Sequence, residues 1–284
     1  MPQKDLHEAN RASWNAATQQ HNTHKGDQAK FLREGGTTLY PDEVELLGDL
    51  TGKTLLHLQC NSGQDTLSIA RHLGATVTGV DISDEAINFA QRLSTDSDIP
   101  GTFIRSDIYD FLAQNDEQFD VVFTSYGVLC WLSDLNAWGA GSAKALKPGG
   151  RLVLLEFHPV FNLFEYENED WKLTYDYMGG THYVFDGVGD YVADAGAALT
   201  LDGSTAEQSD WENPNPSHEF VWGVADVVMA LVSNGLNITL MKDYPYSNGF
   251  NRFPNMIALP GRRYGTPNDM PTMPLMLGVI ATKS

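Results

Sequence analysis

The sequence predicts a doubly wound α/β fold, in which helices cover both faces of a mostly parallel sheet. From Pro41 onward, short β-rich runs alternate with helical runs, and this alternation is typical of βαβ units. Glycine and proline mark the turns, most clearly in LKPGG at 146–150. The expected strands are 54–60, 75–81, 102–107, 119–125 and 151–158, separated by helices at about 64–73, 86–93, 109–114 and 134–146.

The alternation stops after His158. Residues 159–217 contain no convincing long helix but many aromatic residues and several glycine turns. We expect an inserted antiparallel β lid there, because loops this long in compact domains are usually functional. An apolar helix at 219–235 and strands at 237–246 and 274–283 follow. The expected organisation is an N-terminal helical cover (1–40), an α/β core (41–158), a β-rich insertion (159–217) and the completion of the core (218–284).

The chain is strongly acidic. Lys and Arg total 18 against 37 Asp and Glu, a formal net charge of −19 over 284 residues. Solubility alone explains such a charge, but it also repels phosphate backbones and anionic lipids, so we expect no nucleic acid and no membrane as partner. No apolar run approaches the length of a membrane span, and the N-terminal residues lack the apolar stretch of a secretory signal. We therefore expect a cytoplasmic protein.

The two cysteines, Cys60 and Cys130, lie at the ends of apolar runs. Cysteine in that setting usually acts as a small buried hydrophobe. Neither residue has CxxC spacing, and no cluster of His, Cys, Asp or Glu has the spacing of metal ligands. The sequence predicts neither a disulfide framework nor a bound metal.

The first candidate site is LLHLQCNSGQDT at 55–66, where a strand enters a tight loop and then a helix. Such a loop points backbone amides and a helix N-terminus at one crevice. Gly63 permits a close approach of the backbone to a ligand, and Asn61 tolerates a positive φ. Asp81 ends the next strand, where a carboxylate is able to accept both hydroxyls of a ribose. The alternative is an ordinary βαβ turn with an aspartate that caps the following helix.

Three more strand ends carry suitable residues. Asp107 and Ile108 follow the third strand, where the carboxylate suits an adenine amino group and the isoleucine suits the ring. Ser125 and Tyr126 follow the fourth strand, and LKPGG precedes the fifth. Each alone is a turn or a cap. Together they indicate a ligand site, because ligands of open α/β sheets bind at the carboxyl ends of strands near the switch point.

The segment from Gly52 to Leu155, with the closing strands, resembles the class I S-adenosylmethionine-dependent methyltransferases. The resemblance is closest to a bacterial subgroup with an LHLQC first motif, an N-terminal Asn10-Arg11-x-x-Trp14 and TSYGVLCWL after the fourth strand. It implies a Rossmann-like, seven-stranded sheet whose last strand, 274–283, is antiparallel. It also implies S-adenosylmethionine as cofactor, S-adenosylhomocysteine as product and no metal.

The resemblance implies a role for each residue at the strand ends. The loop from Gln59 to Gly63 would pass the methionine moiety, and Asp81 would hold the ribose. Adenine would lie between two isoleucines, with an aspartate on its amino group. The implied cofactor-binding residues are Gln59, Cys60, Asn61, Gly63, Asp81, Ile82, Asp107, Ile108 and Ser125.

The first motif departs from the family pattern D/E-x-G-x-G-x-G. His57, Gln59 and Asn61 stand at its first three defined positions, and only Gly63 is retained. The departure leaves open how the carboxyl and amino ends of methionine are held. Gln59, backbone groups or N-terminal residues are the candidates.

Methyl transfer from a sulfonium is an in-line displacement, to which a protein contributes mainly positioning and desolvation. An oxygen or nitrogen nucleophile also uses a base, and His158, at the end of the fifth strand, is the first candidate. The alternative for His158 is a strand cap that anchors the lid. Tyr126 is a second candidate at the reacting centre, and Trp14, His21 and Tyr246 are candidates for the substrate wall.

The function that these observations favour is methyl transfer from S-adenosylmethionine to a small-molecule acceptor. The aromatic lid over an acidic protein suggests a neutral or cationic, partly apolar acceptor. A non-catalytic sensor that binds S-adenosylmethionine is the first alternative. An NAD-dependent oxidoreductase is the second, disfavoured because G-x-G-x-x-G and a Tyr-x-x-x-Lys pair are missing.

Overall fold

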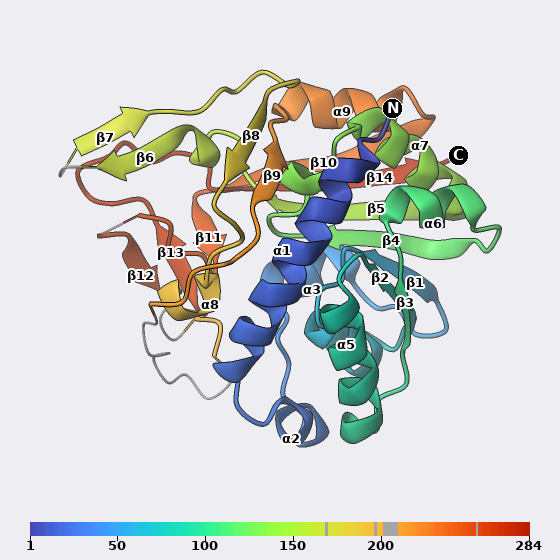
Figure 1. Ribbon diagram of the computed structural model, residues 1–284. Helices are drawn as coiled ribbons and strands as arrows, with labels where there is room; N and C mark the ends of the chain where they lie inside the picture. Colours follow the sequence, from blue (N-terminus) through green and yellow to red (C-terminus); the bar gives the residue numbers. More distant parts are fainter. Residues whose placement is uncertain (168–169, 196–197, 201–209, 254) are drawn as a thin grey trace.

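The computed structural model describes residues 1–167, 170–195, 198–200, 210–253 and 255–284. Its centre is a seven-stranded sheet in the order β10-β14-β5-β4-β1-β2-β3 (Figure 1). Strands β1 to β5 run parallel, and β14 is antiparallel to both β5 and β10. The predicted α/β sheet of seven strands with an antiparallel last strand is thus confirmed. The strands are β1 (Thr54–Leu58), β2 (Thr76–Asp81), β3 (Thr102–Arg105), β4 (Phe119–Ser125), β5 (Leu146–Phe157), β10 (Leu236–Tyr244) and β14 (Met276–Lys283).

Helices bury both faces of this sheet. In β4, Val121 and Phe123 pack on the side of α3 and α4, whereas Val122 packs on the side of α6, α7 and α9. Successive side chains of a strand point to opposite faces, so a strand buried on both sides is apolar throughout. This is why the strand runs are so easy to recognise in the sequence. The helices are α3 (Pro41–Leu47), α4 (Gln64–Leu73), α5 (Asp84–Ser97), α6 (Ile108–Gln114), α7 (Leu135–Ala145) and α9 (Val224–Val232).

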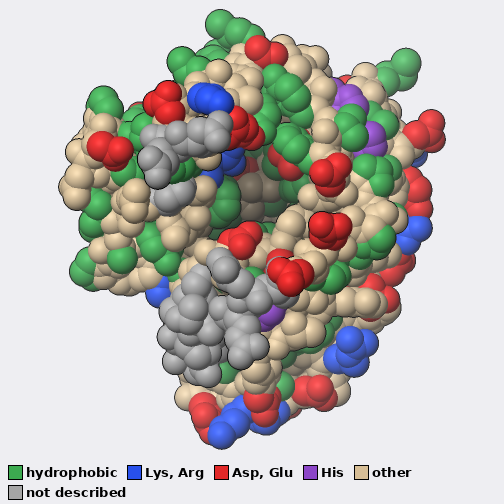
Figure 2. Space-filling view, turned by 60° about the vertical axis from the view of Figure 1, so that its left-hand side comes forward, with side chains coloured by type: hydrophobic (Ala, Val, Ile, Leu, Met, Phe, Trp, Pro, Cys, Tyr) green, Lys and Arg blue, Asp and Glu red, His purple; other side chains and the backbone are tan. Residues whose placement is uncertain are grey.

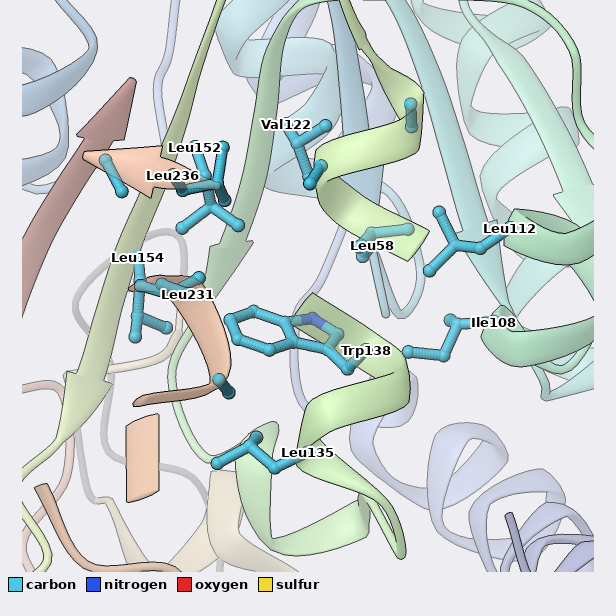
Figure 3. Close-up of a cluster of buried hydrophobic side chains, with 14 of the residues drawn as sticks. Leu58, Ile108, Leu112, Val122, Leu135, Trp138, Leu152, Leu154, Leu231 and Leu236 are labelled. Atoms are coloured by element: carbon cyan, nitrogen blue, oxygen red, sulfur yellow. The ribbon is translucent and has the colours of Figure 1, made fainter. Parts of the chain in front are cut away.

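Trp138 of α7 is the largest side chain in the core. Its exposed fraction is 0%, and it packs in one cluster with leucines of β1, β5 and α9, such as Leu58, Leu154 and Leu231 (Figure 3). Burial of one such leucine side chain contributes about 1.5–3 kcal/mol to folding. This cluster fixes α6, α7 and α9 against one face of the sheet and thereby fixes the positions of the strand ends.

Smaller elements gather at the edge where the parallel strands end. In Figure 1 the hairpin β6–β7, the pair β8–β9 and a three-stranded sheet, β11-β13-β12, lie together at the left of the main sheet. The predicted insertion therefore contains antiparallel hairpins, although its residues 168–169, 196–197 and 201–209 lie outside the described part of the chain. These elements are η1 (Leu129–Trp131), η2 (Phe161–Leu163), β6 (Phe164–Glu167), β7 (Asp170–Leu173), β8 (His182–Phe185), α8 (Tyr191–Asp194), β9 (Ser217–Phe220), β11 (Tyr246–Asn248), β12 (Ile257–Leu259) and β13 (Arg263–Gly265).

The N-terminal helix α1 (Lys4–Thr23) crosses the front of the molecule in Figure 1, and α2 (Gln28–Arg33) follows it. The buried residues of α1 are mostly polar. Asn10 exchanges hydrogen bonds with the backbone of His218 in β9, at 2.8 and 2.7 Å, and Ser13 donates to the carbonyl of Asn215. These bonds join α1 to the inserted strands. Within the described ranges, no helix has both the length and the apolar character needed to span a bilayer.

The predicted helix at 219–235 is wrong at its beginning. Residues Ser217–Phe220 form strand β9, which pairs antiparallel with β8 and sets Phe220 opposite His182. The helix starts only after Gly223, whose amide donates to the carboxylate of Asp226 at 2.8 Å. A partner strand about 35 residues away in the chain decides the conformation of β9, and local periodicity cannot reveal it.

Two further boundaries differ from the predictions. Strand β5 begins at Leu146, not at Arg151, and LKPGG forms an irregularity within it, with Gly149 at φ 75°. The segment after Tyr246, predicted as a loop, contains three short paired strands. In both cases the pairing is too short or too irregular to produce a sequence period.

Gly63, at the start of α4, has two reasons to be glycine. Its φ is 76°, and a Cβ atom there would lie 2.7 Å from the ring of Phe103 and 2.8 Å from the side chain of Ala90. Gly52 also has a positive φ, 73°, but a Cβ atom added to it would meet nothing within 4 Å. Substitution of Gly52 therefore tests backbone strain alone, whereas substitution of Gly63 tests strain and steric overlap together.

We expect Gly63→Ala to destabilise the protein by roughly 2–5 kcal/mol, from left-handed strain and overpacking together. Gly52→Ala should cost only about 1–2 kcal/mol, from the strain alone. Urea unfolding followed by circular dichroism measures both. An equal loss of unfolding free energy in the two variants would show that Phe103 and Ala90 move to accommodate the added Cβ atom at no cost.

Candidate functional site

A cavity of about 750 Å³ opens at the carboxyl edge of the parallel strands. Figure 2 shows the deep hollow on this face, with Asp and Glu side chains around its rim. Its volume lies within the range of about 300–1,000 Å³ typical of small-molecule sites. The predicted site residues that line it are Trp14, Gln59, Cys60, Asn61, Asp81, Ile82, Asp107, Ile108, Ser125 and Tyr126.

The loop after β1 has a left-handed backbone at all three glycine positions of the family pattern, although only Gly63 is a glycine. Gln59, Asn61 and Gly63 have φ values of 55°, 48° and 76°, so all three glycine positions of the family pattern are left-handed. Non-glycine residues are sterically strained in this conformation, and such strain gathers at functional sites. The side-chain amide of Gln59 donates to the backbone carbonyl of Val128 at 2.9 Å. The side-chain carbonyl of Asn61 accepts from the backbone amide of Ser62 at 2.6 Å. These side-chain bonds hold the strained loop.

Asp81 fastens the same loop to the end of β2. Its two carboxylate oxygens accept from the backbone amides of Asn61 at 2.8 Å and Ser83 at 2.9 Å. Burial raises the pKa of Asp81, and these amides oppose the rise. Each carboxylate oxygen retains a lone pair, so the side chain is able to accept further hydrogen bonds from a ligand.

Asp107 caps α6 and also holds α1. One carboxylate oxygen accepts from the amide of Tyr109 at 2.8 Å, and the other from Nδ1 of His7 at 2.7 Å. Burial alone would raise the pKa of Asp107, but the hydrogen bonds from His7 and Tyr109 bring it below the ordinary value. The His7 ring stacks on Tyr109 with centroids 5.3 Å apart. The N-terminal helix thus reaches the end of β3.

Glu156, near the end of β5, is a site-forming residue that the sequence-based predictions missed. Its buried carboxylate accepts from the amides of Val128 at 2.8 Å and Leu129 at 2.9 Å, and also from that of Gly127. Burial raises the pKa of Glu156, and the amides oppose this. A lone acid in the apolar run RLVLLEF was the available signal, because a buried charge requires partners. Glu156 holds the loop that follows β4.

Tyr126 lies in that loop with a φ of 35° and forms part of the cavity wall. Its hydroxyl accepts from the side-chain amide of Asn248 at 2.7 Å. Its ring packs against Tyr40 and Phe157, with centroids 6.1 and 5.7 Å away. The ring is therefore fixed, and its hydroxyl is engaged by the protein.

The structure does not bring four predicted residues to the cavity lining: Gly63, His158, His21 and Tyr246. The His158 ring accepts from the amide of Val160 at 3.1 Å and lies 3.6 Å from Asp243. Burial lowers the pKa of His158. His158 anchors the turn after β5 and is not among the residues that line the cavity.

His21 and Tyr246 are engaged elsewhere. The His21 ring bonds to the carbonyl of Gly189 at 2.8 Å, and burial lowers its pKa to about 4. The Tyr246 hydroxyl donates to Asp42 at 2.9 Å. Trp14 does line the cavity and meets Trp131 edge to face, with ring centroids 5.4 Å apart.

The part of the cavity beneath the inserted strands holds charged groups that local sequence did not indicate. Glu219 of β9 and Arg252 both line it. Arg252 donates to the carbonyl of Phe164 at 3.3 Å, and in the described ranges neither charge has an ion-pair partner. Burial raises the pKa of Glu219 to about 7 and lowers that of Arg252. Among the residues that the structure describes, no group of three His, Cys, Asp or Glu is arranged to hold a metal ion.

The sheet topology defines the fold class of the protein. A seven-stranded sheet with an antiparallel last strand and acids at the ends of β2 and β3 is the arrangement implied by the class I S-adenosylmethionine-dependent methyltransferases. Residues 55–150 match the family described as a methyltransferase domain. This part of the chain is therefore similar to the class I S-adenosylmethionine-dependent methyltransferases.

Known proteins resemble this core in sequence and in structure. The chain is 30% identical over 137 residues to the ubiquinone biosynthesis O-methyltransferase of Proteus mirabilis, covering 48% of this chain and 51% of that protein. It is 33% identical over 117 residues to the demethylmenaquinone methyltransferase of Tropheryma whipplei, covering 40% and 46%. The chain thus spans about half the length of these curated relatives. A crystal structure of an S-adenosylmethionine dependent methyltransferase from Mesorhizobium loti shares the fold, with a TM-score of 0.58 and 19% identity over 88% of this chain and 100% of that one.

We expect Glu219→Gln to change how stability depends on pH. The folded pKa of about 7 exceeds the ordinary value of 4.5, so protonated Glu219 stabilises the fold below pH 4.5 and loses this effect as pH rises through 7. Relative to the parent, the variant should therefore gain on the order of 2 kcal/mol between about pH 4.5 and 8. Denaturant unfolding at a series of pH values measures this. Glu212→Gln, at an exposed position, is the matched control. If the stability of the parent and of Glu219→Gln depends on pH in the same way, the raised pKa of Glu219 is wrong.

Proposed function

We propose that this protein binds S-adenosylmethionine in the cavity and catalyses methyl transfer to a small-molecule acceptor, with S-adenosylhomocysteine as product. The observation that carries the proposal is the convergence of the ends of β1 to β4 on one cavity, with Asp81 and Asp107 in its lining. The family match at 55–150 and the relatives' names support it.

The residues at the strand ends fit the cofactor. Asp81 would accept from the ribose hydroxyls with the lone pairs that its two backbone amides leave free. Ile82 and Ile108 would lie on either side of adenine, and Asp107 would accept from its amino group. Gln59, Cys60, Asn61 and Ser125 would line the path of the methionine moiety toward the acceptor.

The cofactor, when bound, supplies an electrophilic methyl group. The protein contributes an aligned and dehydrated approach for the acceptor. Tyr126 and Trp14 would form the acceptor wall, each held in place by neighbouring aromatic rings. Because Glu219 lines the cavity and His158 does not, we propose Glu219 as the proton acceptor. A carboxyl with a pKa of about 7 is suited to general-base catalysis near neutral pH.

The acceptor in this proposal is a small, partly apolar molecule. Aromatic side chains of the inserted strands, such as Tyr175, Tyr183 and Phe185, line its side of the cavity. The net charge of −19 supports a non-nucleic-acid acceptor, because like charges repel. The free thiols of Cys60 and Cys130 support a reducing, cytoplasmic setting.

Ligand titration separates this proposal from its alternatives. We expect calorimetry to show binding of S-adenosylmethionine and S-adenosylhomocysteine and no binding of NAD. Binding of NAD without either adenosyl ligand would indicate an oxidoreductase. Binding without turnover across a broad panel of phenols, amines and carboxylates would favour a sensor.

Asp81→Asn should weaken S-adenosylhomocysteine binding by roughly 1.5–3 kcal/mol, because the ribose would lose a charged hydrogen-bond acceptor. Calorimetry measures the change, and circular dichroism shows that the variant is folded. Asp116→Asn, at an exposed position, is the matched control and should bind as the parent does. Unchanged affinity in Asp81→Asn would reduce Asp81 to a structural role.

A further inference from the structure

The ammonium group of Lys25 has no partner in the cavity wall among the residues that the structure describes. Lys25 follows His24, the C-cap residue of α1, and lines the cavity. Within the same described ranges, its side chain makes no ion pair or hydrogen bond. Burial lowers the pKa of Lys25 to about 8, and the nearby carboxylate of Asp65 opposes this. Burial of an unpaired charge is costly, so a cation in this position points to an anionic ligand.

Asp65 supplies the opposite charge in the same lining. It lies in the first turn of α4, two residues beyond Gly63, and accepts a hydrogen bond from the hydroxyl of Thr38. Lys25 and Asp65 interact electrostatically but are not within 4.0 Å of each other. The cavity thus presents a separated cation and anion beside the loop after β1. This pair is complementary to a zwitterion, such as the free amino-acid end of a ligand.

The two arginines in the lining lie at other parts of the cavity wall. Arg262 donates to the carbonyls of Thr38 and Ala198, at 3.0 and 3.5 Å, and its guanidinium lies 4.3 Å from the centre of the Tyr40 ring. Arg252 interacts electrostatically with Glu219, under the inserted strands. Of the described cations that line the cavity, Lys25 is therefore the one free to meet a ligand next to the β1 loop.

We propose that Lys25 binds the methionine carboxylate of S-adenosylmethionine and that Asp65 binds its amino group. The inference rests on the proposed function. It supplies the contact that the altered first motif, with His57, Gln59 and Asn61, leaves open. Lys25 acts here as a positioning residue, since the amino-acid end of the ligand does not react.

Two ligands test the proposal. S-adenosylhomocysteine carries the amino-acid end, and 5′-methylthioadenosine lacks it. In calorimetry, Lys25→Met should weaken S-adenosylhomocysteine roughly 10- to 150-fold and leave 5′-methylthioadenosine within about twofold. Lys30→Met, in which the cation removed is exposed on α2, should bind both ligands as the parent does.

The outcomes are distinct. Unchanged S-adenosylhomocysteine affinity in Lys25→Met, or an equal loss for both ligands, overturns the assignment while the proposed function stands. If the parent binds neither ligand, the proposed function fails and this inference fails with it. Asp65→Asn is the second variant, and it should also weaken S-adenosylhomocysteine selectively.

The pH dependence provides an independent readout. The ammonium form of Lys25 is required, so S-adenosylhomocysteine affinity of the parent should fall as pH rises through about 8. The ligand's own amino group titrates equally against parent and variant, so the difference between their curves isolates Lys25. A parallel fall in Lys25→Met overturns the proposal.

Discussion

Two carboxylates, the partly buried Asp81 and the buried Glu156, hold the loops on either side of the point where the sheet reverses its order of growth. β1 lies between β2 and β4, so the chain leaves β1 in one direction and β4 in the other, and the gap between their loops becomes the cavity. Asp81 accepts the amide of Asn61 in the first loop, and Glu156 accepts amides of the second. Each carboxylate exchanges its hydration for fixed backbone dipoles. This exchange lets a charge remain buried and gives both loops one conformation.

The same exchange of solvent for internal hydrogen bonds explains the first motif. Glycine at positions 59 and 61 would relieve the left-handed strain, but it would remove the side-chain bonds of Gln59 and Asn61. The motif is therefore altered in side chains and retained in backbone shape. A sequence pattern compares residue types only, so it does not detect a backbone conformation that different side chains adopt.

The elements that local sequence predicts correctly are those whose conformation is decided by neighbouring residues. The strands of the sheet are apolar on both faces, and α5 and α7 begin at Ser83 and Asp134, whose side chains accept from the helix amides. These features determine the sheet, and the sheet alone brings Asp81, Asp107 and Ser125 to one edge. Strand β9 depends on a partner strand that periodicity does not encode. The position of His158 outside the cavity lining depends on its contacts in the turn after β5, which local sequence does not show.

The unpaired charges of the cavity were equally hidden, because each arrives from a distant segment. Lys25 comes from the N-terminal segment, Glu219 from β9 and Arg252 from the segment after β11.

Helix α1 is the element that joins these parts. It contacts the end of β3 through His7 and Asp107, and it reaches β9 through Asn10. At its far end, His24 bonds to Asp190 beside α8. An N-terminal helix fastened to both the core and the inserted strands places Lys25 beside the β1 loop. The binding residues of the proposed methionine site are therefore fixed by the same bonds that close the cavity.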